Sequence, residues 1–135
     1  MSLGIISIRR FEPKTTRTKK DVERKIELRN KIRGSRSNLP EIRKNCKNKK
    51  VRLKILFYLS KQRIENESKY QKDIDNLLKI TLDVLPKFMD KAEKNKGLGI
   101  IDDDEAVYEI KTKKIFVKND VEQGIDIEIF KASGT

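Results

Sequence analysis

The stretch Lys72–Lys91, KDIDNLLKITLDVLPKFMDK, combines apolar residues at helical spacing with carboxylates at its start. The apolar residues of this stretch that repeat every three or four positions are Ile74, Leu77, Leu78, Leu82, Leu85 and Met89. That spacing predicts a helix from about Ile74 to Lys91 that buries one face against a sheet. Asp73 or Asp75 suits the N-cap, because a short carboxylate accepts hydrogen bonds from the free amides of the first turn. Pro86 lies inside the predicted helix and is expected to kink or shorten it.

Alternation of apolar and polar residues predicts the strands of a sheet. The alternating stretches are Val51–Leu59, Val107–Lys118 and Ile125–Phe130, and the β-branched run Ile5–Ile8 predicts a short first strand. Thr15–Arg33 has the composition of a helix, with a ragged apolar face and Thr18 or Asp21 as its cap. A turn around Asn119–Gly124 is expected to join the last two strands. This order predicts one α+β domain over residues 1–135, a mixed β-sheet packed against two helices.

Positive charge is concentrated in the first half of the chain. Residues 1–72 contain 23 Lys+Arg against 7 Asp+Glu, a balance of +16, whereas residues 73–135 contain 10 against 14, a balance of −4. Gly34–Lys50 mixes Gly, Ser, Asn, Pro and Lys, which predicts a basic loop or mobile arm. Such a balance favours nucleic acid as the partner, because Lys and Arg neutralise phosphates. The DNA-binding residues predicted in this arm are Arg36, Arg43, Lys44, Lys47, Lys49 and Lys50.

The composition excludes several classes of function. The chain has no histidine, which removes a histidine general base, a histidine-based triad and ordinary zinc sites. Cys46 is the only cysteine, so no disulfide can form within the chain and a reducing interior is expected. No apolar run approaches ~18–20 residues, so we expect no membrane span. Usage rich in Lys, Ile and Asn suggests an AT-rich bacterial or phage genome. With the single cysteine, we expect a cytoplasmic protein.

Two groups of carboxylates suggest a metal site. Asp73 and Asp75 lie two residues apart where a loop is expected to become the helix. In an extended stretch, residues i and i+2 point the same way, so both carboxylates could face one cation. Phosphodiester hydrolysis without histidine requires a hard cation, and magnesium, or manganese in its place, takes oxygen ligands. Lys79 lies one turn beyond Asp75, close enough to the cation to contact a scissile phosphate.

The second group is the acidic run Asp102–Glu105. Asp103 and Asp104 would complete the site if the strand entered at Ala106 runs beside the start of the helix. Taken alone, the same run reads as an acidic turn. Asp73 and Asp75 can likewise be read as helix caps, and the spacing of Asp75, Lys79 and Asp83 as a solvated row of helix ion pairs.

The two acidic groups together form a compound pattern: Asp-x-Asp-Asn-x-x-Lys at a helix start, a further Asp and Leu on that helix, and Ile-x-Asp-Asp before a strand. The matching positions are Asp73, Asp75, Asn76, Lys79, Asp83, Leu85, Ile101, Asp103 and Asp104. This pattern resembles the RusA family of Holliday-junction resolvases over Lys72–Lys114, about a third of the chain. The segment Pro86–Ile100 is longer than that family's pattern, and the Pro-rich N-terminal opening of the family is absent.

The resemblance implies a small, homodimeric, magnesium-dependent α+β endonuclease that nicks four-way junctions symmetrically. The metal ligands that it implies are Asp73, Asp75 and Asp104, with Asp103 as helper or alternate. It implies Lys79 as the catalytic lysine, and Lys72 as the basic residue before the first Asp, which joins the predicted DNA-binding residues. The apolar faces of Val51–Leu59 and of the C-terminal strands are expected to exceed what two helices can cover, which places the dimer interface on the sheet.

Two functions from different classes follow. The first is a structure-selective endonuclease that cleaves four-way or branched DNA in recombination or repair. The second is a non-catalytic basic DNA- or RNA-binding protein, with a junction binder that has lost cleavage as an intermediate case. A pure binder has no need to gather negative charge beside its phosphate-binding surface, and this favours the nuclease.

Overall fold

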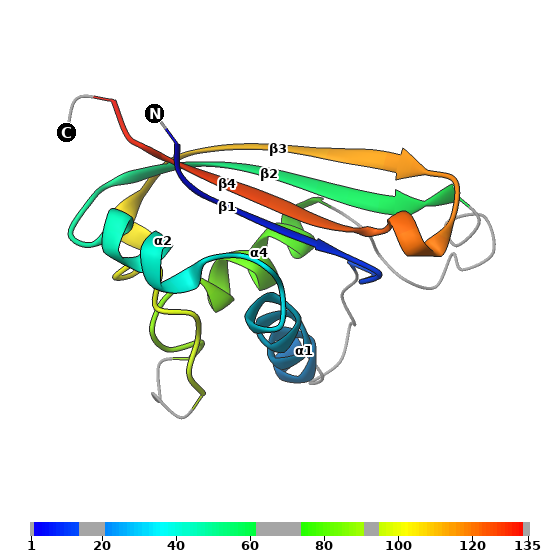
Figure 1. The fold of residues 1–135 in the computed structure, drawn as a ribbon, viewed down its shortest axis with the longest axis horizontal. Helices are drawn as coiled ribbons and strands as arrows, with labels where there is room; N and C mark the ends of the chain where they lie inside the picture. The colour runs from blue at the N-terminus through cyan, green and yellow to red at the C-terminus, as the bar shows by residue number, and fades with distance from the viewer. Residues whose placement is uncertain (1, 14–20, 62–73, 91–94, 134–135) are drawn as a thin grey trace.

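Four strands form one mixed sheet in the order β1-β4-β2-β3 (Figure 1). The strands are β1 (Ser2–Arg9), β2 (Val51–Ser60), β3 (Val107–Val117) and β4 (Gly124–Lys131). β4 pairs antiparallel with both β1 and β2, whereas β2 and β3 are parallel. The structure, a computed structural model, describes residues 2–13, 21–61, 74–90 and 95–133. The four predicted strands are therefore confirmed. β1 extends beyond the predicted Ile5–Ile8, and the ends of the other three strands lie within one residue of those predicted.

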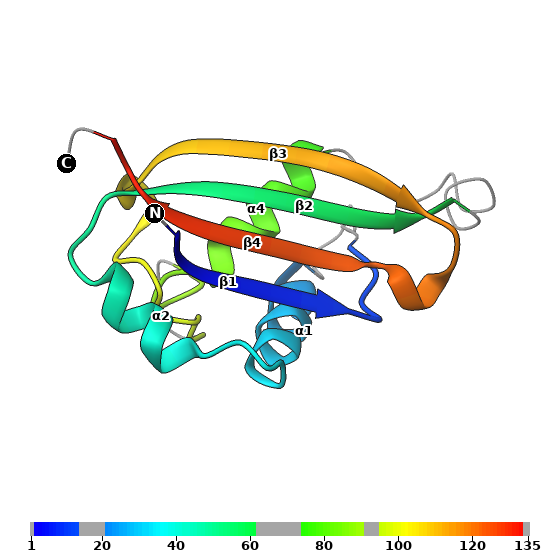
Figure 2. The ribbon, with the colours of Figure 1, turned by 45° about the horizontal axis from the view of Figure 1, so that its top comes forward.

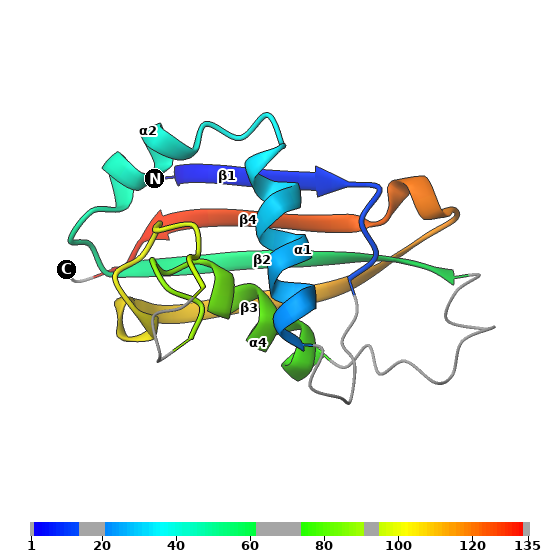
Figure 3. The same cartoon turned by 90° about the horizontal axis from the view of Figure 1, so that it is seen from below.

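The three α-helices of the described residues lie on one face of this sheet (Figures 1 and 3). They are α1 (Asp21–Arg33), α2 (Leu39–Cys46) and α4 (Ile74–Val84), and two short 3₁₀ helices, η1 (Asp104–Ala106) and η2 (Asp120–Glu122), precede β3 and β4. The α+β class with a mixed sheet is confirmed, but the described residues form three α-helices where two were predicted. Among the described residues, no helix combines the length and apolar character that crossing a membrane requires.

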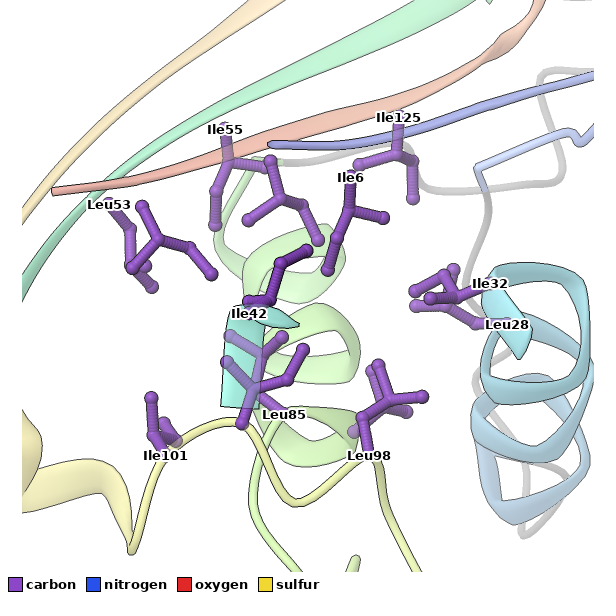
Figure 4. Packing of buried hydrophobic residues seen from close by; sticks show 14 of the residues in the cluster. Ile6, Leu28, Ile32, Ile42, Leu53, Ile55, Leu85, Leu98, Ile101 and Ile125 are labelled. Atoms are coloured by element: carbon purple, nitrogen blue, oxygen red, sulfur yellow. The ribbon is translucent and has the colours of Figure 1, made fainter. Parts of the chain in front are cut away.

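The core lies between the sheet and the helices. Ile55 and Phe57 of β2 and Ile127 of β4 are fully buried, and Leu28 of α1 and Val84 of α4 pack in the same cluster (Figure 4 shows part of it). Burial of one such side chain contributes about 1.5–3 kcal/mol. The apolar faces of β2 and β4 are thus covered within the chain, whereas Phe116 of β3 is exposed, and the homodimer interface on the sheet stays a prediction.

The β2–α4–β3 connection explains why β2 and β3 are parallel. Two parallel neighbours need a crossover, and α4 provides it on the helical side of the sheet (Figure 2). β4 then pairs with β2 on the opposite side from β3, so the two C-terminal strands are not neighbours. The predicted turn between them contains η2, which carries the chain past the end of β2.

The segment predicted as a loop or mobile arm, residues 34–50, contains α2, and that part of the prediction is wrong. The side chain of Asn38 caps the helix by accepting a hydrogen bond of 3.2 Å from the amide of Glu41. Leu39, Ile42 and Cys46 are buried and form one apolar face of this two-turn helix. α2 packs directly on β1, since a Cβ added at Gly4 would lie 2.5 Å from Ile42 Cγ1.

α4 ends at Val84, well before the predicted end at Lys91. Pro86 follows two residues later, and the residue before a proline disfavours helical backbone. The chain then turns outward and returns, because Leu98 and Ile100 donate backbone hydrogen bonds of 2.8 Å to the carbonyls of Val84 and Leu85. This return brings the following residues to the end of α4.

Candidate functional site

Carboxylates gather around an open depression where α4 ends and β3 begins, here called the acidic depression. It has a volume of about 410 Å³. The residues that line it are Asp83, Pro86, Lys87, Phe88, Met89, Asp90, Asp102, Asp103 and Asp104. The structure therefore brings the predicted site residues Asp103 and Asp104 together with Asp83, although Asp83 precedes Asp103 by 20 residues in the sequence.

The chain path around the end of α4 produces this convergence. Asp83 lies in the last turn of α4, one residue before the helix ends at Val84. The backbone of Ile101 pairs with that of Pro86 in a short parallel bridge, so the residues that follow Ile101 start beside the helix end. Asp104 opens η1, three residues before β3.

Asp103 has a structural role of its own. Its carboxylate accepts a hydrogen bond of 2.8 Å from the amide of Glu105 and so caps η1. Its backbone carbonyl accepts another of 3.1 Å from Ala106. This bonding orients η1 and leaves Asp104, the next residue, to face the depression.

Asp104 makes no ion pair and no side-chain hydrogen bond with the described residues. Partial burial, followed by the negative charges of Asp83 and Asp103, raises the pKa of Asp104 above its ordinary value. Asp83 differs, because Lys25 of α1 forms an ion pair with it at 2.8 Å. Sequence reasoning missed Lys25, since only the packing of α1 against α4 brings the two side chains together.

Asp75 and Lys79 lie on α4 but do not line the acidic depression. Both are exposed and lie on roughly the same side of the helix, Asp75 two turns and Lys79 one turn before Asp83. Eight residues of helix separate Asp75 from Asp83, which corresponds to about 12 Å along the axis. Asp73 and Lys72 lie outside the described residues. Among the residues that are described, no group of three or more carboxylates is placed to hold a metal ion.

The last turn of α2 and the segment that joins it to β2 contain most of the predicted DNA-binding residues, and this part of the chain lies at the same end of the sheet as the start of β3 (Figure 1). The first residue of β2, Val51, pairs with Val107, the first residue of β3, so the segments preceding both strands are neighbours. The exposed basic residues of the segment before β2 are Lys44, Lys47, Lys49 and Lys50. Lys50 places its Nζ 5.9 Å from the centre of the Tyr108 ring on β3.

The two arginines of the predicted set have other surroundings than these lysines. Arg43 is half-buried, and its Nε donates a hydrogen bond of 2.7 Å to the carbonyl of Leu98. It therefore fastens the segment that returns to the end of α4, which is a structural role. Arg36 lies in a groove beside the end of β1.

The chain matches no protein-family model, no curated protein and no solved structure.

Proposed function

We propose that this protein is a magnesium-dependent endonuclease that cleaves four-way or otherwise branched DNA. The observation that carries the proposal is the position of the acidic depression beside exposed lysines at one end of the sheet. Lysines of the segment before β2 would hold phosphates, and the carboxylates before β3 would lie next to the same backbone. A protein that only binds DNA gains nothing from carboxylates at that position, because they repel phosphate.

The donor chemistry of the depression fits a hard divalent cation. Carboxylate oxygens are the ligands that Mg²⁺ takes, usually one or two with waters and substrate oxygens completing the octahedron. Asp104 is the first candidate, because Lys25 already compensates Asp83 and η1 uses the carboxylate of Asp103. The RusA-like pattern also assigns Asp73 and Asp75 to the metal site, but Asp75 lies about 12 Å along α4 from Asp83 and does not line the acidic depression. When bound, the cation would activate water and neutralise charge that develops on the phosphate.

Lys79 would contact the phosphate from the exposed side of α4. It lies one turn after Asp75 and one turn before Asp83, so its ammonium group extends from between the two carboxylates. A positive group at this place stabilises charge that increases in the transition state. Two copies of the chain in a homodimer would provide the two sites that symmetric nicking of a junction requires.

The test is a synthetic four-way junction incubated with the protein, with magnesium, with manganese and with neither. We expect cleavage only with a divalent cation, and we expect Asp104→Asn to reduce the rate by ~10²-fold or more while junction binding is kept. Glu128→Gln is the matched control, because it removes one carboxylate from β4, on the strand face opposite the buried Ile127 and Ile129. It should cleave at the wild-type rate.

In the same assay, Lys79→Ala should slow single-turnover cleavage by ~10²-fold at unchanged affinity. Equal losses in binding and in rate would make Lys79 an ordinary phosphate contact.

The rival function, a non-catalytic nucleic-acid-binding protein, is favoured by one observation. The described carboxylates do not by themselves form a set of three that could hold a metal ion. Tight junction binding without cleavage under either cation would establish the rival and end the nuclease proposal. Cleavage that persists in Asp104→Asn would instead remove this residue from the site.

A further inference from the structure

A second charged surface lies on the edge of the sheet formed by β1. A groove of about 800 Å³, here called the basic groove, runs between the end of β1 and the end of α1 with the turn that follows it. Four of its lining residues are cationic, Arg9, Arg10, Lys31 and Arg36, and none of its lining residues is acidic. Ser7 and Ser35 also line it, and their hydroxyls donate hydrogen bonds to Asp126 and to the carbonyl of Ile32.

The packing of α2 explains why the groove is open. β1 is an edge strand, and α2 covers its first half, where Ile42 meets Gly4 and the side-chain amide of Asn45 donates 3.0 Å to the carbonyl of Leu3. The second half of β1, from Ser7 onward, lies beyond α2 and forms one wall of the groove.

The end of α1 forms the other wall. A helix C-terminus carries a partial negative charge, but at this end of α1 that charge is offset. The amide of Gly34 donates 3.0 Å to the carbonyl of Asn30, and both the amide and the hydroxyl of Ser35 donate to the carbonyl of Ile32. Because these carbonyls accept hydrogen bonds and Lys31 lies in the last turn, the partial negative charge at the end of the helix is offset and does not repel a bound anion.

The cations of the groove differ in how far their charge is already used. Arg9 forms an ion pair of 2.8 Å with Asp126 of β4. Within the described part of the chain, Arg10, Lys31 and Arg36 are exposed and make no ion pair. Arg10 also has a left-handed backbone, φ 56°, which is unfavourable for a residue with a Cβ. Three uncompensated cations on one concave surface repel each other until an anion binds between them.

We propose that the basic groove binds the sugar-phosphate backbone of DNA as a site separate from the acidic depression. Guanidinium groups bind phosphate in a bidentate manner, and a lysine ammonium binds it as a point charge. A protein partner fits less well, because an interface core needs exposed apolar side chains, and the apolar lining residue Ile8 is only 3% exposed.

The position of the groove indicates what it would hold. β1 and β3 are the two opposite edges of the sheet, and the end of β1 pairs with the start of β4, at the opposite end from the starts of β2 and β3 (Figure 3). The basic groove and the acidic depression are therefore diagonal across the sheet. DNA bound at both would extend well beyond the cleavage point, as one arm of a branched substrate does. This inference rests on the proposed DNA substrate but not on cleavage.

The test is a set of charge variants measured by equilibrium binding to a fluorescent four-way junction without divalent cations. The groove variant is Arg10→Gln, Lys31→Gln, Arg36→Gln. The matched control is Lys111→Gln, Lys113→Gln, Lys118→Gln, which removes three exposed charges on β3 and just after it, at the other edge of the sheet. We expect the groove variant to bind about 10-fold more weakly or worse, with a log–log salt slope smaller by up to ~0.9 per lost contact. The control should change both quantities much less.

Equal losses in the two triple variants would mean that net charge alone acts, and would overturn the proposal. A groove variant that loses affinity for poly-glutamate but not for DNA would also overturn it, in favour of an acidic protein partner. Arg36→Glu alone, in the turn after α1, gives a second reading if the triple variant does not fold, and it should weaken binding in the same direction. Because no step of this assay needs cleavage, its failure is distinct from failure of the nuclease proposal.

Discussion

At the residue scale, the acidic depression is a place where charge opposes folding. Asp104 lies close enough to Asp83 and Asp103 for their charges to raise its pKa, in addition to the effect of its partial burial. Lys25 compensates Asp83, and the amide of Glu105 bonds the carboxylate of Asp103, but Asp104 has no such partner among the described residues. Uncompensated carboxylates of this kind are characteristic of sites that bind a cation or a substrate.

The raised pKa of Asp104 predicts an effect on stability that depends on pH. A carboxyl group whose pKa is raised in the folded state favours folding while it is protonated, and this contribution is lost as pH rises through the folded pKa. Asp104→Asn should therefore raise the Tm of the metal-free protein at pH 7, by about 1–3 °C. The gain should vanish below about pH 3, where the wild-type group is protonated as well.

Thermal unfolding followed by circular dichroism across this pH range measures the effect, with Glu128→Gln as the control for loss of one charge. Magnesium should raise the Tm of the wild type but not that of Asp104→Asn, because a ligand stabilises only the state that binds it. A lower Tm for Asp104→Asn at pH 7 would contradict this account of the depression.

At the scale of elements, α2 shows how a short helix determines which surfaces are left open. Its buried residues cover the first half of β1 and close that part of the edge. Its half-buried Arg43 bonds the carbonyl of Leu98, in the segment that leads to the acidic run. α2 thereby fastens the segment that leads to the acidic run and leaves the second half of β1, one wall of the basic groove, uncovered.

The cap of α2 can be tested with a single residue. Asn38→Ala should lower the free energy of unfolding by about 0.5–2 kcal/mol, because the exposed side chain contributes mainly the hydrogen bond to the amide of Glu41. Asn38→Asp should restore most of the loss, since aspartate is an equally good cap. Chemical denaturation of the three proteins measures both effects. An unchanged stability in Asn38→Ala would mean that residues 39–46 behave as the loop that their composition suggested.

At the scale of the whole molecule, the helices occupy one face of the sheet and a polar network supports the other. Asp126 accepts hydrogen bonds from Arg9, Ser7 and Tyr58 on neighbouring strands. Burial alone would raise the pKa of Asp126, but these hydrogen bonds hold it below its ordinary value. The guanidinium of Arg9 also lies 4.2 Å from the centre of the Tyr58 ring. This network joins β1, β4 and β2 on the face of the sheet opposite the helices.

The proposed homodimer predicts a response to salt. Each chain carries a formal charge of +12, so electrostatic repulsion between two copies opposes association at low ionic strength. Salt screens that repulsion, and the dimer should persist or strengthen as salt is raised. Sedimentation equilibrium at micromolar concentration measures the mass across a salt series. A monomer mass at moderate salt would end the paired-nick mechanism and leave only single-site nicking to be tested.

Much of the fold follows from short-range patterns of apolar and polar residues in the sequence. Alternation in Val51–Leu59 places side chains on two faces of a strand, and the three-to-four spacing from Ile74 places them on one face of a helix. These periodicities are local geometry, so the strands and the start of α4 could be predicted. The acidic run at residues 102–105 was likewise visible as a candidate site. α2 was missed because two turns rich in Lys, Asn and Pro carry too little periodic signal to outweigh composition.

Tertiary packing alone decided the rest. No local pattern states that β4 pairs between β1 and β2, since that choice depends on which apolar faces the helices can cover together. The ion pair of Lys25 with Asp83 joins two helices, and the return of the chain after Pro86 brings Asp104 beside Asp83. The same packing leaves about 12 Å of helix between Asp75 and Asp83. The sequence by itself determined which residues bear charge and which turn inward, while the pairing of distant elements decided which of those charges meet.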